Sequence, residues 1–300
     1  MTSSLRALLS GLFDYAGLFP PAALDMQEAV RLFAAHGCGP RAWMLGRFIV
    51  PAARIDEFER ELPGALATSP RPEPWRVSVL AAPPFDDTVA RIWDFNGTHG
   101  ACGSRDAVID AVEVKASTAA ELEDAAQAIP AGFELFVETP TVNAPAELLA
   151  AVRSCGATAK FRTGGTSPGE IPSVHGLAAS MAACHGLGLS FKVTAGLHHP
   201  VRSNRPLTYD REAPRADLHG FLNVLVAAAV MSAGWVDAAG AAGILVEESP
   251  DAFRVAEESL AWRGHRLTLA DLRLARRFFR TIGSCSFDEP VADLEALGLL

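Results

Sequence analysis

Residues 157–196 read ATAKFRTGGTSPGEIPSVHGLAASMAACHGLGLSFKVTAG, and this stretch contains the pattern that decides the fold. It begins with a short apolar run, continues with a longer segment of helical character and ends with a second short apolar run. Ser173 stands where a helix N-cap is expected, and Gly188 follows the expected helix end. The stretch therefore predicts a strand, a helix and a second strand.

The same alternation of a short apolar run with an amphipathic segment repeats along the chain. Eight such units in 300 residues are what a closed (β/α)8 barrel needs. A doubly wound open sheet is the alternative, but no G-x-G-x-x-G follows the first predicted strand to support dinucleotide binding. We therefore predict an α/β fold of the (β/α)8 TIM barrel class. The predicted strands lie within 12–22, 42–50, 75–84, 110–117, 133–140, 157–165, 189–196 and 242–249.

The chain is expected to form one domain, residues 1–300. No Gly/Ser linker or long charge run divides it, and 49% hydrophobic residues can fill a large core. After a helix expected in 250–264, residues 267–300 are predicted to be a C-terminal helical appendage that packs against the barrel.

Composition limits the possible partners and the compartment. The net charge of −9 disfavours nucleic-acid binding, and neither a secretion signal nor an uninterrupted membrane-spanning run is evident. We expect a cytoplasmic protein that acts on a small molecule and does not bind membranes, and a homo-oligomer is compatible with the sequence.

The cysteines are odd in number, scattered and never in a C-x-x-C pair, which disfavours a disulfide framework or a thiolate zinc site. The tail motif GSCSFDEP, 283–290, suggests no chemistry from its sequence. The five cysteines are Cys38, Cys102, Cys155, Cys184 and Cys285.

Lysine is rare in this chain, with three residues against twenty-three arginines. Lys115, Lys160 and Lys192 fall near the carboxyl ends of the fourth, sixth and seventh predicted strands. Barrel enzymes place their chemistry at that end. The positions of the lysines therefore point to a functional pocket.

Strand alternation predicts which side chains share a face with each lysine, because residues two apart point the same way. A charged core without chemistry is the alternative, but buried ion pairs seldom improve stability over apolar residues. We therefore expect an interior polar pocket. Its predicted members are Glu113 with Lys115, Lys160 with Arg162, Lys192 with Thr194, Glu134 and Phe136 with Glu138, and Glu247 or Glu248 from the eighth predicted strand.

An amine becomes a nucleophile where neighbouring cations and an apolar pocket favour its neutral form. Lys160 is the first candidate, because Lys115 and Lys192 lie on neighbouring or next-neighbouring strands and Arg162 is two residues away. Its amine would attack a ketone or aldehyde, and the resulting iminium would serve as an electron sink for cleavage or formation of a C–C bond. Glu138, Glu113 or Tyr15 would move the proton.

The motifs KFRTGG (160–165) and FKVTAG (191–196) resemble the deoxyribose-phosphate aldolase branch of the class I (Schiff-base) aldolases. The resemblance implies that Lys160 is the Schiff-base lysine, that Lys192 is the cation beside it and that no cofactor is needed. It covers residues 158–197.

Two departures from that family concern the substrate. Phe161 and Arg162 replace small hydroxyl residues, and the eighth predicted strand lacks a Gly/Ser-rich phosphate-binding turn. A carboxylate or an unphosphorylated polyol, held by Arg162, is therefore expected, in carbohydrate or keto-acid metabolism. The predicted substrate-binding residues are Arg162, Thr194, His198, His199, Asn223 and Glu247.

Two alternatives stay open. The first is a metal-dependent lyase or hydrolase in which His198, His199 and His219, with Glu138 and Glu247, bind a divalent cation. The second is a barrel that binds anions without turnover, which the interior glutamates disfavour because an anion binder gains nothing from them.

Overall fold

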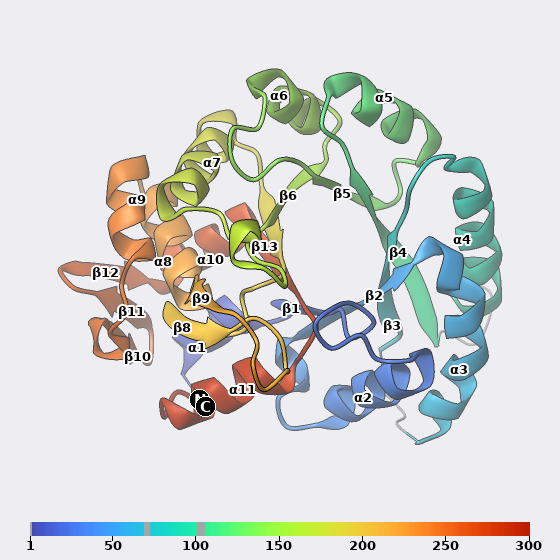
Figure 1. The fold of residues 1–300 in the computed structure, drawn as a ribbon, viewed down its shortest axis with the longest axis horizontal. Helices are drawn as coiled ribbons and strands as arrows, with labels where there is room; N and C mark the ends of the chain where they lie inside the picture. Colours follow the sequence, from blue (N-terminus) through green and yellow to red (C-terminus); the bar gives the residue numbers. More distant parts are fainter. Residues whose placement is uncertain (1, 69–72, 101–105) are drawn as a thin grey trace.

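The computed structural model describes residues 2–68, 73–100 and 106–300. Within these residues, eight parallel strands close into a barrel that is surrounded by helices (Figure 1), which confirms the predicted fold class. In order around the ring, the strands are β1 (Phe13–Tyr15), β13 (Phe279–Ser284), β7 (Phe191–Thr194), β6 (Thr158–Arg162), β5 (Glu134–Glu138), β4 (Ala107–Lys115), β3 (Trp75–Leu80) and β2 (Leu45–Pro51).

Each barrel strand is followed by a helix of the outer ring. The predicted cap Ser173, like Asp25 and Thr118, accepts a backbone N–H from the first helical turn, and Gly188 ends its helix in the left-handed conformation. The helices are α2 (Met26–Cys38), α3 (Ile55–Thr68), α4 (Asp86–His99), α5 (Ala119–Ala128), α6 (Ala146–Ser154), α7 (Val174–Leu187), α8 (Phe221–Ser232) and α11 (Asp288–Ala296).

The prediction of the eighth strand was wrong. Residues 242–249 begin inside helix α9 (Ala238–Leu245), whose alanine-rich sequence is capped by Asp237. The eighth strand is β13, which lies between β7 and β1 and closes the ring. Residues 267–300 are therefore not an appendage, because they supply α10 (Leu269–Phe278), β13 and α11.

Two antiparallel elements interrupt the β/α repeat. A hairpin of β8 (Ser203–Pro206) and β9 (Arg215–Leu218) lies between β7 and α8. The helix expected in 250–264 is replaced by a small sheet of β10 (Phe253–Ala256), β11 (Ser259–Trp262) and β12 (His265–Thr268). The remaining elements are α1 (Ser3–Leu9) and the 3-10 turns η1 (Ala42–Met44), η2 (Ala52–Arg54), η3 (Pro168–Glu170) and η4 (Pro250–Ala252).

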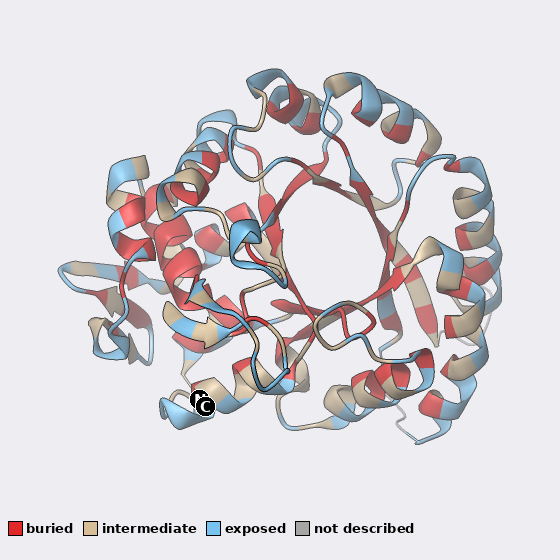
Figure 2. Cartoon of the chain, in the orientation of Figure 1, coloured by how far each residue is buried: buried red, intermediate tan, exposed pale blue. Residues whose placement is uncertain are grey.

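The core lies between the strands and the helices, as the burial colours in Figure 2 show. Phe161 and Phe191 are fully buried, and the ring of Phe191 packs edge-on against Phe278 of α10 with centroids 4.9 Å apart. Because strand residues alternate between faces, the neighbours Lys160 and Lys192 point into the barrel. In the described part of the chain, no helix combines the length and the apolar character needed to cross a membrane.

The position of β13 leads to a stability prediction. Ile282 is fully buried between Phe13 and Val193 in the barrel register. We expect Ile282→Ala to lower the free energy of unfolding by roughly 2–5 kcal/mol, because it leaves a cavity in the core. The measurement is urea unfolding followed by circular dichroism.

Leu274→Ala in α10 is the matched control, because Leu274 is 44% exposed. It should change the free energy of unfolding by less than about 0.5 kcal/mol. Equal, small effects of the two substitutions would contradict a structural role of residues 279–284 in the barrel.

Candidate active site

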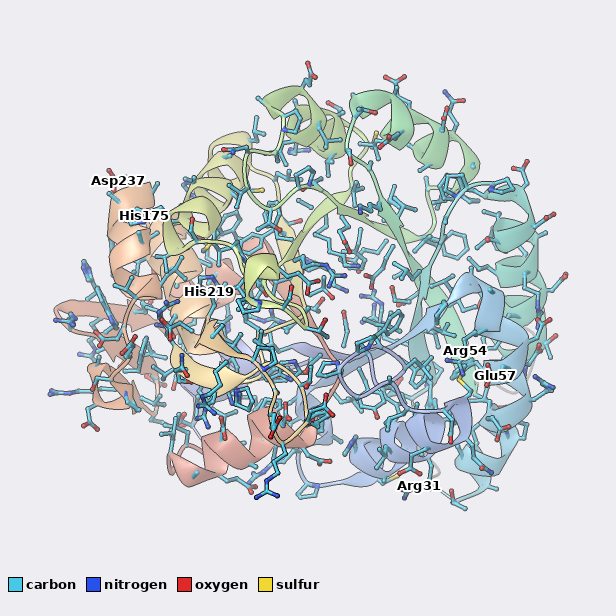
Figure 3. All side chains as sticks on the ribbon, in the orientation of Figure 1. Arg31, Arg54, Glu57, His175, His219 and Asp237 are labelled. Carbon is cyan, nitrogen blue, oxygen red and sulfur yellow. The ribbon has the colours of Figure 1, made fainter. Side chains whose placement is uncertain are left out.

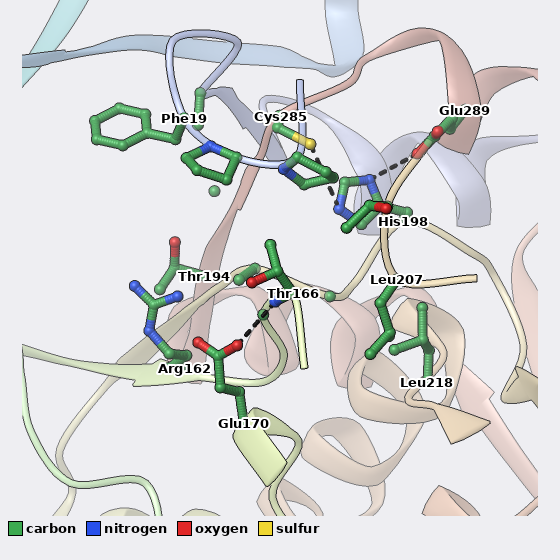
Figure 4. Close-up of a pocket in the computed structure, with 18 of the residues that line it drawn as sticks. Phe19, Arg162, Thr166, Glu170, Thr194, His198, Leu207, Leu218, Cys285 and Glu289 are labelled. Atoms are coloured by element: carbon green, nitrogen blue, oxygen red, sulfur yellow. Dashed lines mark hydrogen bonds and ion pairs between the residues drawn. The ribbon is translucent and has the colours of Figure 1, made fainter. Parts of the chain in front are cut away.

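A cavity of about 410 Å³ opens at the carboxyl ends of the barrel strands. Glu138, Arg162 and Thr194 are the last residues of β5, β6 and β7, and all three line it. Loops after the strands complete the wall, as Figure 4 shows for Phe19, Thr166 and other residues. Active sites of barrel enzymes lie at this end of the ring.

Lys160 lies in the wall of this cavity between two carboxylates. Its Nζ is 2.9 Å from Glu113 Oε2 and 2.8 Å from Glu138 Oε2. Glu138 continues the chain of charges, since its Oε1 is 3.7 Å from Arg162 Nε. Lys160 is only 4% exposed, so the cavity is its route to a small molecule.

Lys192 has a different environment, because it is fully buried and does not line the cavity. Its Nζ donates to Asp14 Oδ2 at 2.8 Å and to Glu113 Oε1 at 2.9 Å. The ammonium also lies 4.3 Å from the ring centroid of Phe136, a cation–π distance. Burial opposes the charged form, but the two carboxylates outweigh burial and raise the pKa of Lys192. Lys192 is therefore a fixed positive charge beneath the cavity.

Glu113 joins the two lysines. Its carboxylate contacts both ammonium groups and also accepts a hydrogen bond from Ser78 Oγ at 2.8 Å. Burial would raise the pKa of Glu113, but Lys160 and Lys192 outweigh burial and hold that pKa well below its ordinary value. The pKa of Glu138 is lowered in the same way, with the Lys160 ammonium outweighing burial.

Asp14 completes the buried cluster. Its Oδ2 accepts from Thr281 Oγ1 at 2.7 Å, and its Oδ1 accepts from the backbone N–H of Arg47 at 2.9 Å. A Cβ at Gly46 would lie 2.3 Å from Asp14 Oδ1, so glycine makes room for this carboxylate. Six charged groups thus alternate in sign: Asp14, Lys192, Glu113, Lys160, Glu138 and Arg162.

A second group of charges lies around Glu134, at the start of β5. Arg47 contacts Asp110 at 2.6 Å and Glu134 at 2.7 Å, and Arg280 contacts Glu134 at 3.0 Å. Glu134 was expected in the interior pocket with Glu138, but it does not line the cavity. These charges therefore link strands at the opposite end of the barrel from the pocket.

Besides Lys192, two more residues predicted to be catalytic lie outside the cavity. Lys115 is exposed at the end of β4, the longest barrel strand, where its side chain reaches solvent. Tyr15 is buried against the rings of Phe33 and Phe48, because alternation in β1 sends it to the face opposite Asp14. Asp14, which the prediction passed over, takes the interior position.

The predicted metal ligands do not gather at one point. His198 and His199 line the cavity, but each contacts a separate carboxylate of α11. His219 Nε2 lies 2.9 Å from the carbonyl of Pro172, on the side of the barrel where α7 and α8 lie (Figure 3). Glu247 pairs with Arg263 at 2.7 Å. Across residues 2–68, 73–100 and 106–300, no three His, Cys, Asp or Glu side chains are arranged to hold a metal ion.

Asn223 and Glu247 were predicted to bind substrate, but neither lines the cavity. Asn223 is fully buried, accepts from the N–H of Arg202 and donates to the carbonyls of Ile244 and Glu247. Asn223 therefore links the first turn of α8 to the segments that precede and follow this helix. Glu247 lies elsewhere because 242–249 do not form a barrel strand.

Three residues of the cavity wall with reactive side chains were not among the predicted site residues. Cys285 follows β13, Glu289 lies in the first turn of α11, and Tyr209 comes from the β8–β9 hairpin. The paired histidines at the end of β7 were the one signal for this side of the pocket, and their partners are distant in sequence. Cys102, the cysteine of residues 101–105, lies outside the described residues.

No protein-family model matches this chain, and neither does any curated protein or solved structure. The resemblance to the deoxyribose-phosphate aldolase branch therefore stays a prediction. Barrels of this class host many enzymes, with chemistry set by residues at the strand ends. The function must be argued from those residues.

The buried position of Glu113 leads to a second prediction. We expect Glu113→Gln to lower the free energy of unfolding by roughly 3–5 kcal/mol, because two ammonium groups then face a neutral amide. Glu123→Gln, at an exposed position of α5, is the control and should change little. Equilibrium unfolding in urea at pH 7 measures both.

The pH dependence has a definite sign. Because the pKa of Glu113 is lowered in the folded state, its stabilising contribution is complete above about pH 4.3, the ordinary Glu value. That contribution is lost as the pH falls below this value. Below pH 4 the unmodified protein should therefore lose stability more steeply than Glu113→Gln, and parallel acid profiles would contradict the ion-pair account.

Proposed function

We propose that this protein is a carbon–carbon lyase of the aldolase type, or a related enolising enzyme, that uses Lys160 to form a Schiff base. The observation that carries the proposal is the place of the Lys160 amine, in the cavity wall and held by two carboxylates. Of the three lysines, Lys115 is exposed outside the cavity and Lys192 is sealed beneath it. Lys160 alone combines an amine with access to a bound carbonyl compound.

Glu138 is placed to move the proton that the reaction requires. It takes a proton from the Lys160 ammonium, and the neutral amine adds to the carbonyl carbon of the substrate. The protonated carboxyl then gives its proton to the oxygen of the adduct. Glu138 next moves a second proton from the nitrogen to the same oxygen, which leaves as water when the iminium forms. Glu138 is only partly buried and lines the cavity, so it meets both the lysine and the substrate.

The charge pattern suits this intermediate. An iminium on Lys160 carries the same positive charge as the ammonium, so Glu113 and Glu138 still have a cation between them. These carboxylates are fixed before the reaction and stabilise charge without rearranging. The iminium then withdraws electrons from the adjacent carbon, which allows a C–C bond to break or form.

Lys192 supports the site by balancing the charge of Glu113. The sequence predicted a cluster of neighbouring cations around Lys160, but Glu113 lies between the two ammonium groups. With Lys192 and Asp14 paired beneath it, Glu113 is not left with an uncompensated charge when Lys160 becomes neutral. Lys192 is in this view a positioning residue.

The cavity favours a small carbonyl compound with an anionic or hydroxylated end. Arg162 lines the cavity and about half of its side chain is exposed, so its guanidinium can meet a carboxylate. Phe19, Pro20 and Leu207 supply apolar wall. The mixture of the half-exposed Arg162 guanidinium and apolar surface fits a short keto acid or a small polyol aldehyde.

Borohydride trapping tests the proposal. Incubation with pyruvate or glycolaldehyde followed by reduction should attach the carbon skeleton to Lys160, and peptide mass spectrometry should locate it. Lys160→Arg should abolish the adduct while keeping the charge, and Lys115→Arg should leave it unchanged. If no lysine adduct forms and a chelator abolishes turnover, these results would instead support the metal-dependent alternative.

Arg162 provides a separate prediction on substrate choice. We expect Arg162→Gln to raise KM for a carboxylate-bearing carbonyl substrate about tenfold, the effect of losing one charge-assisted hydrogen bond, with kcat changed little. An uncharged substrate of similar size should show no such change. Steady-state kinetics on the two substrates measure this effect. An equal rise in KM for both substrates would contradict the anion-binding role of Arg162.

A further inference from the structure

A second set of reactive groups lies in the wall of the same cavity, opposite Arg162 and Glu170 in Figure 4. Cys285 Sγ is 3.8 Å from His198 Nε2, and His198 Nδ1 is 2.8 Å from Glu289 Oε2. The thiol of Cys285 thus lies beside one ring nitrogen of His198, and the carboxylate of Glu289 lies beside the other. This is the arrangement by which a thiol is activated by a base and the base is oriented by a third group.

The fold brings these three side chains together from neighbouring elements. His198 follows β7 and Cys285 follows β13, and these two strands are paired in the barrel. Glu289 lies in the first turn of α11, where its backbone N–H donates to Ser286 Oγ at 3.2 Å. Tyr209 of the hairpin adds a hydroxyl 4.0 Å from Cys285 Sγ. The group is therefore held by four separate segments.

The electrostatics fit a proton held on His198. Burial disfavours the charged ring, but Cys285 and Glu289 outweigh it and raise the pKa of His198 to about 10. The groups that face His198 are Cys285, Glu289, Ser284 and the adjacent His199. A cationic imidazole beside a sulfur atom favours the thiolate, which is the reactive form of cysteine.

We propose that Cys285 is a second nucleophile of this pocket, with His198 as its base and Glu289 as the positioning residue, and that it adds reversibly to a small aldehyde. The choice of an aldehyde rests on the proposed function, whereas the activation of the thiol rests on the Cys285–His198–Glu289 geometry alone. The proposed Schiff base uses Lys160 with Glu113 and Glu138, so the two nucleophiles belong to separate sets of side chains.

The step balances without an oxidant. The reaction starts with the thiol proton on His198, and the thiolate sulfur forms a bond to the carbonyl carbon of the aldehyde. The π electrons of the carbonyl move to its oxygen, which takes the proton from His198. The product is a hemithioacetal on Cys285, and the reverse steps release the aldehyde.

Alkylation by iodoacetamide tests the activation, with other cysteines of the same chain as internal controls. Cys38 and Cys155 are exposed, whereas Cys285 is 6% exposed. At pH 6.5 ordinary thiols are almost wholly protonated, since their pKa is about 8.5. We expect peptide mass spectrometry to show Cys285 reacting at least tenfold faster than the two exposed cysteines. An equal or slower rate at Cys285 would overturn the proposal.

Two variants separate activation from a purely structural contact. His198→Gln should remove the advantage of Cys285 at pH 6.5 and make its rate rise with pH like that of Cys38. Glu289→Gln should produce a smaller change in the same direction. Melting curves check that the variants fold, and an unchanged pH profile in folded His198→Gln would contradict the role of His198 as base.

The aldehyde is tested in Lys160→Arg, which cannot form a Schiff base. Glycolaldehyde should slow the alkylation of Cys285 at least fivefold in this variant and leave Cys38 unaffected. Absence of protection would overturn the aldehyde assignment. Because borohydride trapping reports on Lys160 and alkylation reports on Cys285, failure of one proposal is distinguishable from failure of the other.

Discussion

The interior of this barrel depends on one buried carboxylate, Glu113, placed between two ammonium groups. A carboxylate removed from water is costly unless cations and hydrogen-bond donors surround it, and Lys160, Lys192 and Ser78 do so here. Each partner comes from a different strand. The satisfaction of Glu113 therefore requires that β3, β4, β6 and β7 keep one register around the ring, and a shift of one residue would turn these charges toward the apolar helices.

The same cluster links stability to chemistry. Five of its six charged groups belong to pairs in which at least one side chain is almost fully buried, so their geometry is set by packing before any substrate enters. Glu113, Lys160, Glu138 and Arg162 are the members of the cluster that line the cavity. The Lys160 amine thus stands on a rigid base of paired charges, and barrels commonly combine a stable core with functional residues at the strand ends.

The sequence predicted the fold class and most of this cluster because both follow local periodicities. Alternation in 110–117 and 157–165 was sufficient to turn Glu113 and Lys160 inward and Phe161 outward. The prediction of a strand in residues 242–249 was wrong because their apolar run is as compatible with a buried helix as with a strand. Periodicity does not separate these two possibilities. Cys285 and His198, 87 residues apart, meet only because β7 and β13 are neighbours. No local pattern predicts such a contact.

The two sides of the cavity meet opposite chemical demands. Lys160 must lose a proton to react, and its neighbours are carboxylates that accept protons and stabilise a cation. Cys285 must also lose a proton, but the product is an anion, and its neighbour is an imidazole that becomes a cation when it accepts the proton. Carboxylates beside the sulfur would repel a thiolate, and an imidazolium beside the amine would oppose an iminium. Glu289 lies beyond His198, where it stabilises the imidazolium through Nδ1 while the ring separates it from the sulfur. The separation of carboxylates and imidazole between two walls would therefore allow the two proposed nucleophiles to share one small cavity.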